Sequence, residues 1–269
     1  MLLGCLSIQA ADDDLITKQI TIKLDKAGTL PDRIASSKKY KITNLKIVGE
    51  INGTDWNMIR EMAGRNYQES STEGNLSVLD LSEAKIVAGG DYYYYDNLFN
   101  NKVYTSNDEI GEYAFAYCSG LTSLTLPVGI TSIGEFAFSG CSGLTSLTLP
   151  AGITSIGEFA FSYCSGLTSI YVYAEKVPRI GRYAFEGCAS RKCTLYVPKG
   201  TYDNYRLSEF GYFENIVEFD ATGIDKTTTS TDVEEVSRYS LNGQRLVGPT
   251  KGLNIVKYSD GSVKKVAVE

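Results

Sequence analysis

Apolar residues in the middle of the chain recur in a short pattern with fixed spacing. In residues 144–150 the pattern is Leu-x-x-Leu-x-Leu-Pro, in which apolar and polar positions alternate towards the end. This alternation predicts a short β-strand whose leucines point inward, and the proline ends the strand because it cannot donate to a sheet ladder. The segment Gly157–Ser162 that follows this unit suits one helical or 3₁₀ turn that returns the chain.

The unit is copied along the chain. Segments 110–132 and 133–155 are identical at 19 of 23 positions, a third copy begins at Ile156, and a more divergent fourth begins at Ile180. One unit of this length cannot bury its own leucines and phenylalanines, whereas stacked copies form a continuous core. The pattern therefore predicts a right-handed, curved leucine-rich-repeat solenoid with a parallel β-sheet.

The ends of the array are less regular. Residues 42–47 and 76–81 repeat the strand pattern at longer spacing, and residues 54–63 between them predict an amphipathic helix that ends at Gly64. After the repeats, the runs around Asn242-Gly243 and Asp260-Gly261 carry the hairpin signals of a small antiparallel β module.

These features divide the chain into five expected segments. They are a signal-peptide remnant (1–10), a divergent leucine-rich flank that caps the solenoid (11–109), the regular repeats with a C-terminal cap (110–220), a polar linker (221–232), and the β module (233–269).

The first residues indicate export. The apolar run up to Ala10 turns abruptly acidic at Asp12, which is typical of the end of a secretory signal. Two alternatives stay open: the signal is cleaved after Ala10, or Cys5 in Leu2-Leu3-Gly4-Cys5 is lipidated and anchors the protein. No run of 18 apolar residues occurs, so we expect no transmembrane segment.

Composition excludes several classes of function. The 269 residues include no histidine, which excludes His-based acid–base catalysis and His metal ligands. The net charge of −6 argues against nucleic acid as a partner. The only charged residues between 110 and 170 are Glu112, Glu135 and Glu158, which share one repeat position and suit a solvated edge better than a cation site. We therefore expect no cofactor and no metal.

The cysteines also follow the repeat. Cys118, Cys141, Cys164 and Cys188 share one position, so stacking directs their side chains in parallel rather than towards one point. We interpret them as small buried hydrophobic residues. Cys193 lies outside the pattern, and a disulfide between Cys188 and Cys193 stays open.

Two groups of tyrosines are the candidate binding residues. The outward position between the last two leucines forms a column that ends in Tyr171 and Tyr196, on the concave face that solenoids use for binding. The second group is Tyr92, Tyr93, Tyr94 and Tyr95, in the irregular stretch 88–109. One strand cannot bury four consecutive tyrosines, so we expect two of them to face a partner. The alternatives are an ordinary polar sheet face and packing over the flank of the solenoid.

The repeat Ile-Gly-x-x-Ala-Phe-x-x-Cys-x-x-Leu-x-x-Leu-x-Leu-Pro over residues 110–200 resembles the BspA-like class of bacterial leucine-rich repeats. Residues 233–269 are similar to C-terminal modules of exported Bacteroidetes-type proteins, some of which are sorting signals. The resemblance implies a non-enzymatic adhesion protein, secreted or on the bacterial surface, that binds a host or matrix protein or a glycan. A secreted hydrolase such as a glycosidase and a purely structural envelope protein are the alternatives.

Overall fold

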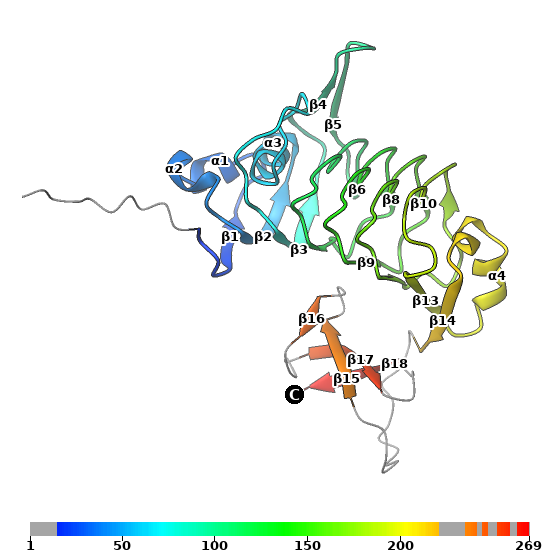
Figure 1. The fold of residues 1–269 in the computed structure, drawn as a ribbon. Helices are drawn as coiled ribbons and strands as arrows, with labels where there is room; N and C mark the ends of the chain where they lie inside the picture. Colours follow the sequence, from blue (N-terminus) through cyan, green and yellow to red (C-terminus); the bar gives the residue numbers. More distant parts are fainter. Residues whose placement is uncertain (1–14, 221–234, 241–243, 247–251, 259–262, 269) are drawn as a thin grey trace, which may run out of the picture.

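The computed structural model describes residues 15–220, 235–240, 244–246, 252–258 and 263–268 (Figure 1). The possible cleavage site at Ala10, the lipidation candidate Cys5 and the linker 221–232 lie outside the described residues. None of the helices in these described ranges is long and apolar enough to span a membrane.

The solenoid is built on parallel strands that follow one another in chain order (Figure 1). The first ladder contains β1 (Ile20–Leu24), β2 (Asn44–Ile51), β3 (Val78–Ile86) and β7 (Ser123–Thr125). The second contains β9 (Ser146–Leu149), β11 (Ser169–Val172), β13 (Thr194–Pro198) and β14 (Asn215–Phe219). The Thr145 amide donates to the Thr122 carbonyl at 3.4 Å, which joins the two ladders.

The register of the strands is the one that the sequence pattern predicts. Ser146 pairs with Ser169, Thr148 pairs with Tyr171, and Tyr171 pairs with Tyr196. Equivalent repeat positions therefore stack into columns, and the leucines and phenylalanines of successive units form one continuous buried cluster. The predicted solenoid fold with its parallel sheet is confirmed.

A second parallel sheet runs along the other side of each unit. Its two-residue strands are β6 (Glu109–Ile110), β8 (Ser132–Ile133), β10 (Ser155–Ile156) and β12 (Arg179–Ile180). After each of them the chain returns through hydrogen-bonded turns, not through the helical or 3₁₀ turn that we expected. The returns differ because Phe136 and Phe159 adopt a φ of 52°, and alternate backbone N–H groups of each return donate to the next repeat while those between them bond within their own turn. The Phe138 amide, for example, donates to the Ala160 carbonyl at 2.7 Å.

Helices lie at both ends of the solenoid. The N-terminal flank carries α1 (Leu30–Arg33), α2 (Ser36–Lys39) and α3 (Gly53–Met62), and α3 is the helix that the sequence predicts. Its cap is Asn52, which forms a capping box with Asp55. At the other end α4 (Tyr202–Arg206) and the 3₁₀ helix η1 (Glu209–Tyr212) cover the last repeat, where Phe210 packs on Phe185 at 5.2 Å between ring centroids.

Two antiparallel elements depart from the solenoid. Strands β4 (Gly89–Asp96) and β5 (Asn101–Thr105) form a hairpin that projects from the array in Figure 1. The C-terminal module is a four-stranded antiparallel sheet, in the order β16 (Arg245–Leu246), β15 (Glu235–Ser240), β17 (Gly252–Tyr258) and β18 (Val263–Val268). This sheet confirms the predicted antiparallel module.

Candidate functional site

The outward-facing column of side chains on the concave sheet is buried, although we expected it to be exposed to solvent. Tyr171 and Tyr196 stack at 4.4 Å between ring centroids, but they are only 1% and 5% exposed. Thr125 and Thr148 in the same column are also buried. The expectation that the two tyrosines face solvent is therefore wrong, although their positions in the column are as predicted.

The C-terminal module covers these tyrosines. Tyr239 of β15 lies 6.1 Å from the ring of Tyr171, and Ile255 of β17 belongs to the same buried cluster as Tyr171 and Tyr196. Burial raises the pKa of Tyr171, with the neighbouring tyrosines acting in the same direction. The aromatic pair is thus an intramolecular docking surface for residues more than 40 positions away in the sequence, which no local pattern predicts.

A cleft of about 460 Å³ remains between the module and the hydroxyl-rich strands of the sheet. It is lined by Thr122, Ser123, Thr145, Ser146, Thr168, Ser169, Tyr239 and Gln244. The three threonine hydroxyls already form hydrogen bonds within the protein. Each donates to a backbone carbonyl of the preceding unit at 3.0 to 3.4 Å. They stabilise the stacking of the repeats and are poor candidates for ligand recognition.

Two of the four consecutive tyrosines are packing residues. Tyr93 is buried and donates its hydroxyl to the Glu112 carbonyl at 2.9 Å. Tyr94 is buried and stacks on Tyr113 with ring centroids 4.2 Å apart. The buried pair is adjacent rather than alternate, because the strand pairing shifts register between Gly89 and Tyr94. Packing over the flank of the solenoid, the alternative to binding, accounts for these two residues.

The other two tyrosines are half-buried in an aromatic cluster at the hairpin. Tyr92 lies 5.4 Å from Tyr67 and 6.3 Å from both Tyr95 and Tyr104, measured between ring centroids. The ammonium group of Lys102 lies 4.8 Å from the Tyr92 ring. These contacts stiffen the hairpin, and they leave Tyr92 and Tyr95 partly accessible from outside.

The tip of the hairpin carries the most exposed apolar residues of the region. Leu98 is 90% exposed and Phe99 is 80% exposed. The turn that presents them is ordered by Asp96, whose carboxylate accepts hydrogen bonds from the Leu98 and Phe99 amides at 2.8 and 3.2 Å. In addition, Tyr95 donates its hydroxyl to the Asn100 side chain at 2.6 Å. This pair was not among the expected binding residues, although an apolar dipeptide between Asn97 and Asn100 is a local sequence signal for it.

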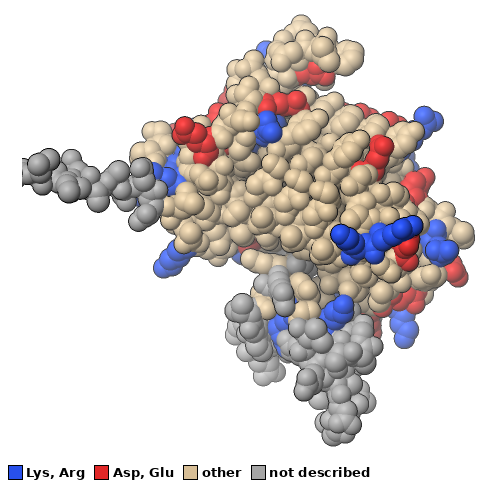
Figure 2. All heavy atoms as spheres, in the orientation of Figure 1, with Lys and Arg blue, Asp and Glu red and all other residues tan. Residues whose placement is uncertain are grey.

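The base of the hairpin is held on helix α3. The Thr54 hydroxyl donates to the Asp91 carboxylate at 2.9 Å, and the Asn57 side chain donates to the Tyr92 carbonyl at 2.7 Å. Gly53 allows this approach, because a Cβ there would lie 1.8 Å from the Asp91 carbonyl oxygen. The hairpin is therefore a braced projection rather than a free loop. In Figure 2 it stands off the solenoid as a largely uncharged knob.

The repeated cysteines and glutamates play structural roles. All five described cysteines are buried and free, so Cys188 and Cys193 form no disulfide. Burial raises the pKa of Cys118 to about 11 and that of Cys193 to about 12, which keeps these thiols protonated.

The glutamate column is exposed, as expected. Partial desolvation and the charges of Glu135 and Glu109 raise the pKa of Glu112. Among the described residues, no group of three or more cysteine or carboxylate side chains is arranged to hold a metal ion.

The repeat region matches a known family. A family model for the BspA-type leucine-rich repeat region matches residues 88–205 with six copies. Among solved structures, a leucine-rich repeat protein from Bacteroides ovatus ATCC 8483 is 23% identical over 67% of this chain and 43% of that one, with a TM-score of 0.38. The chain thus spans less than half of that structure. No curated protein matches the chain. Residues 88–205 of the chain therefore form a leucine-rich repeat region of the BspA type.

Proposed function

We propose that this chain is an exported, non-enzymatic binding protein that contacts its partner through the tip of the β4–β5 hairpin. The observation that carries the proposal is the exposed pair Leu98 and Phe99 on a braced projection. The solenoid then serves as the scaffold that holds the tip away from the rest of the surface. The partner is an extracellular protein or a glycan, and an apolar tip favours a protein.

The physical argument rests on the arrangement of the pair rather than on exposure alone. Single exposed apolar residues are common on protein surfaces and need no explanation. Here two large apolar side chains are adjacent, and hydrogen bonds to their backbone amides order the turn that carries them. Preorganisation lowers the entropy lost on binding, and aromatic anchors contribute disproportionately to the binding free energy.

Export is supported by the apolar start of the chain and by the repeat type. A binding role is supported by the general use of solenoids as extended interaction surfaces. The hydrolase alternative has less support, since the repeats between 110 and 170 contain only the three exposed glutamates of one column as charged residues. In Figure 2 the visible face of these repeats is correspondingly poor in charge.

The test is a binding screen of the full chain against immobilised collagens, laminins and mucin glycans. For any partner found, we expect the double substitution Leu98→Ser and Phe99→Ser to weaken binding by roughly tenfold or more. Leu207→Ser is the matched control, because Leu207 is 88% exposed at the opposite end of the solenoid. The control should bind like the unmodified protein.

Two outcomes contradict the proposal. Full affinity in the double serine variant would assign the hairpin tip no role in the contact. Cleavage of the glycans, detected as a change in their mass after incubation, would favour the hydrolase instead. Thermal unfolding of both variants should match the unmodified protein, because neither substitution touches the buried core.

A further inference from the structure

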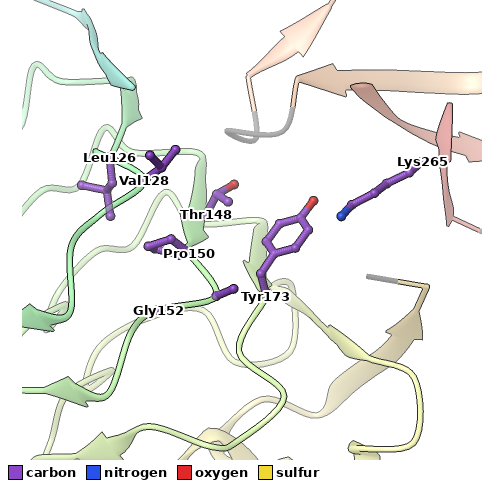
Figure 3. Close-up of a pocket in the computed structure, with 8 residues that line it drawn as sticks. Leu126, Val128, Thr148, Pro150, Gly152, Tyr173 and Lys265 are labelled. Atoms are coloured by element: carbon purple, nitrogen blue, oxygen red, sulfur yellow. The ribbon is translucent and has the colours of Figure 1, made fainter. Parts of the chain in front are cut away.

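A second site lies between the solenoid and the C-terminal module, away from the hairpin. The turns that follow β7, β9 and β11 and the strand β18 line a partly open pocket of about 280 Å³ (Figure 3). It is lined by Leu126, Val128, Thr148, Pro150, Ala151, Gly152, Tyr173 and Lys265. Most of this lining is aliphatic. A cavity of about 150 Å³ lined by apolar side chains already accommodates benzene, so this pocket has room for a ring-sized apolar group.

Two buried hydroxyl groups in the pocket lack a partner. The Thr148 hydroxyl and the Tyr173 hydroxyl each have less than 1 Å² of exposed surface and form no hydrogen bond within the described part of the chain. Thr148 as a whole is 9% exposed. Figure 3 shows both hydroxyls directed into the space between the solenoid and the module. A buried hydroxyl without a partner costs about 1–3 kcal/mol, so a group that pairs with both of them offsets a cost that the free protein carries.

The remaining polar group of the pocket is also a donor. The Lys265 ammonium lies 4.7 Å from the Tyr173 ring centroid, and Figure 3 shows it facing that ring. Burial lowers the pKa of Lys265, and the charge of Asp220 opposes this shift. Burial also raises the pKa of Tyr173, so its hydroxyl keeps its proton. None of the described residues that line the pocket is a carboxylate, so these side chains offer two hydroxyl donors and one ammonium group but no negative charge.

We propose that this pocket binds a small molecule with an apolar, ring-sized body and a hydrogen-bond-accepting head, such as a carbonyl or a carboxylate. The body lies against the aliphatic turn residues, and the head accepts hydrogen bonds from Thr148 and Tyr173. A pocket that is mostly apolar with a few convergent polar groups is the usual form of a small-molecule site. Sugars fit poorly, because they need many more polar partners than this lining offers.

The test is isothermal titration calorimetry on the full chain with phenylacetate and phenylacetamide as probes. Toluene, which lacks the head, and methyl glucoside, which lacks the apolar body, are the comparison compounds. We expect at least one of the two headed probes to bind about five- to tenfold more tightly than toluene, which corresponds to one or two hydrogen bonds. Methyl glucoside should not bind.

Three variants separate this site from non-specific binding. Thr148→Val keeps the shape and removes the hydroxyl, so we expect it to weaken the headed probes about fivefold and to raise the unfolding temperature of the free protein. Thr125→Val is the matched control, since Thr125 is buried in the same column outside the pocket. Ala151→Phe places a ring in the pocket and should abolish binding.

Either of two results would overturn the proposal. One is the absence of saturable binding for both headed probes. The other is binding that Thr148→Val and Ala151→Phe leave unchanged. A lower unfolding temperature for Thr148→Val would count equally against it, since it would show that the hydroxyl already has a stabilising partner.

Discussion

At the scale of single residues, two columns of rings have different surroundings. Phe138 and Phe161 stack in the interior with ring centroids 5.0 Å apart, and both are fully buried. Phe136 and Phe159 also stack at 5.0 Å, but they lie at the half-exposed edge of the returns. The same residue type and the same spacing therefore contribute differently to stability, because only the inner column loses all of its contact with water.

This difference predicts the result of matched substitutions. Phe161→Ala should lower the free energy of unfolding by about 3–5 kcal/mol, as large-to-small changes of buried aromatic residues do. Phe159→Ala, in the same repeat, should cost clearly less. Urea unfolding of both variants measures the difference, and equal losses would show that the inner column has no special place in the core.

At the scale of elements, the stacking of repeats depends on close contact between their backbones. At Gly143 a Cβ would lie 2.3 Å from the carbonyl oxygen of Ser119 in the preceding repeat. At Gly120, which occupies the same position in the first regular repeat, a Cβ would meet no atom within 4 Å. The glycine is thus required only where another regular repeat precedes it.

We therefore expect opposite outcomes for one substitution at two equivalent positions. Gly143→Ala should destabilise the protein, because the Cβ forces two backbone segments apart, whereas Gly120→Ala should be neutral or slightly stabilising. Thermal unfolding distinguishes them. Similar losses at both positions would mean that glycine serves the turn itself rather than the stacking of repeats.

At the scale of the whole molecule, the C-terminal module and the solenoid share a small aromatic core. Tyr171, Tyr196 and Phe219 of the solenoid pack with Ile255 of the module. Replacing an exposed tyrosine pair would leave the stability of the protein unchanged. Replacing this buried pair should lower the stability, because it removes the contact with the module. The concave face is therefore partly filled by the chain's own C-terminal sheet.

The double substitution Tyr171→Ser and Tyr196→Ser tests this contact. It should lower the free energy of unfolding by at least about 3 kcal/mol and increase amide hydrogen exchange in β15 and β17. The control is Tyr163→Ser with Tyr183→Ser, because both tyrosines are more than half exposed on the same solenoid. The control should change stability by no more than about 0.5 kcal/mol per site. Unchanged exchange in the first variant would show that the module does not rest on the tyrosines.

The sequence alone determined the features that depend on repetition. The copied unit predicted the parallel sheet, its register and the buried columns of Phe138, Phe161 and the cysteines. The physical reason is that each unit contacts mainly its neighbours, so a local pattern repeated at a constant period specifies most of the contacts. Helix α3 was also predictable, since it follows from local amphipathicity and the glycine that ends it.

Only the tertiary structure decided what covers the columns and what stands out from them. The burial of Tyr171 and Tyr196 depends on Tyr239 and Ile255, which lie in a module without the repeat pattern. The hairpin that presents Leu98 follows from long-range hydrogen bonds to α3, and the pocket at Thr148 needs a wall from β18. Contacts between segments without a common period leave no local signature in the sequence, so the support of the hairpin and the walls of the pocket emerged only when the chain was folded.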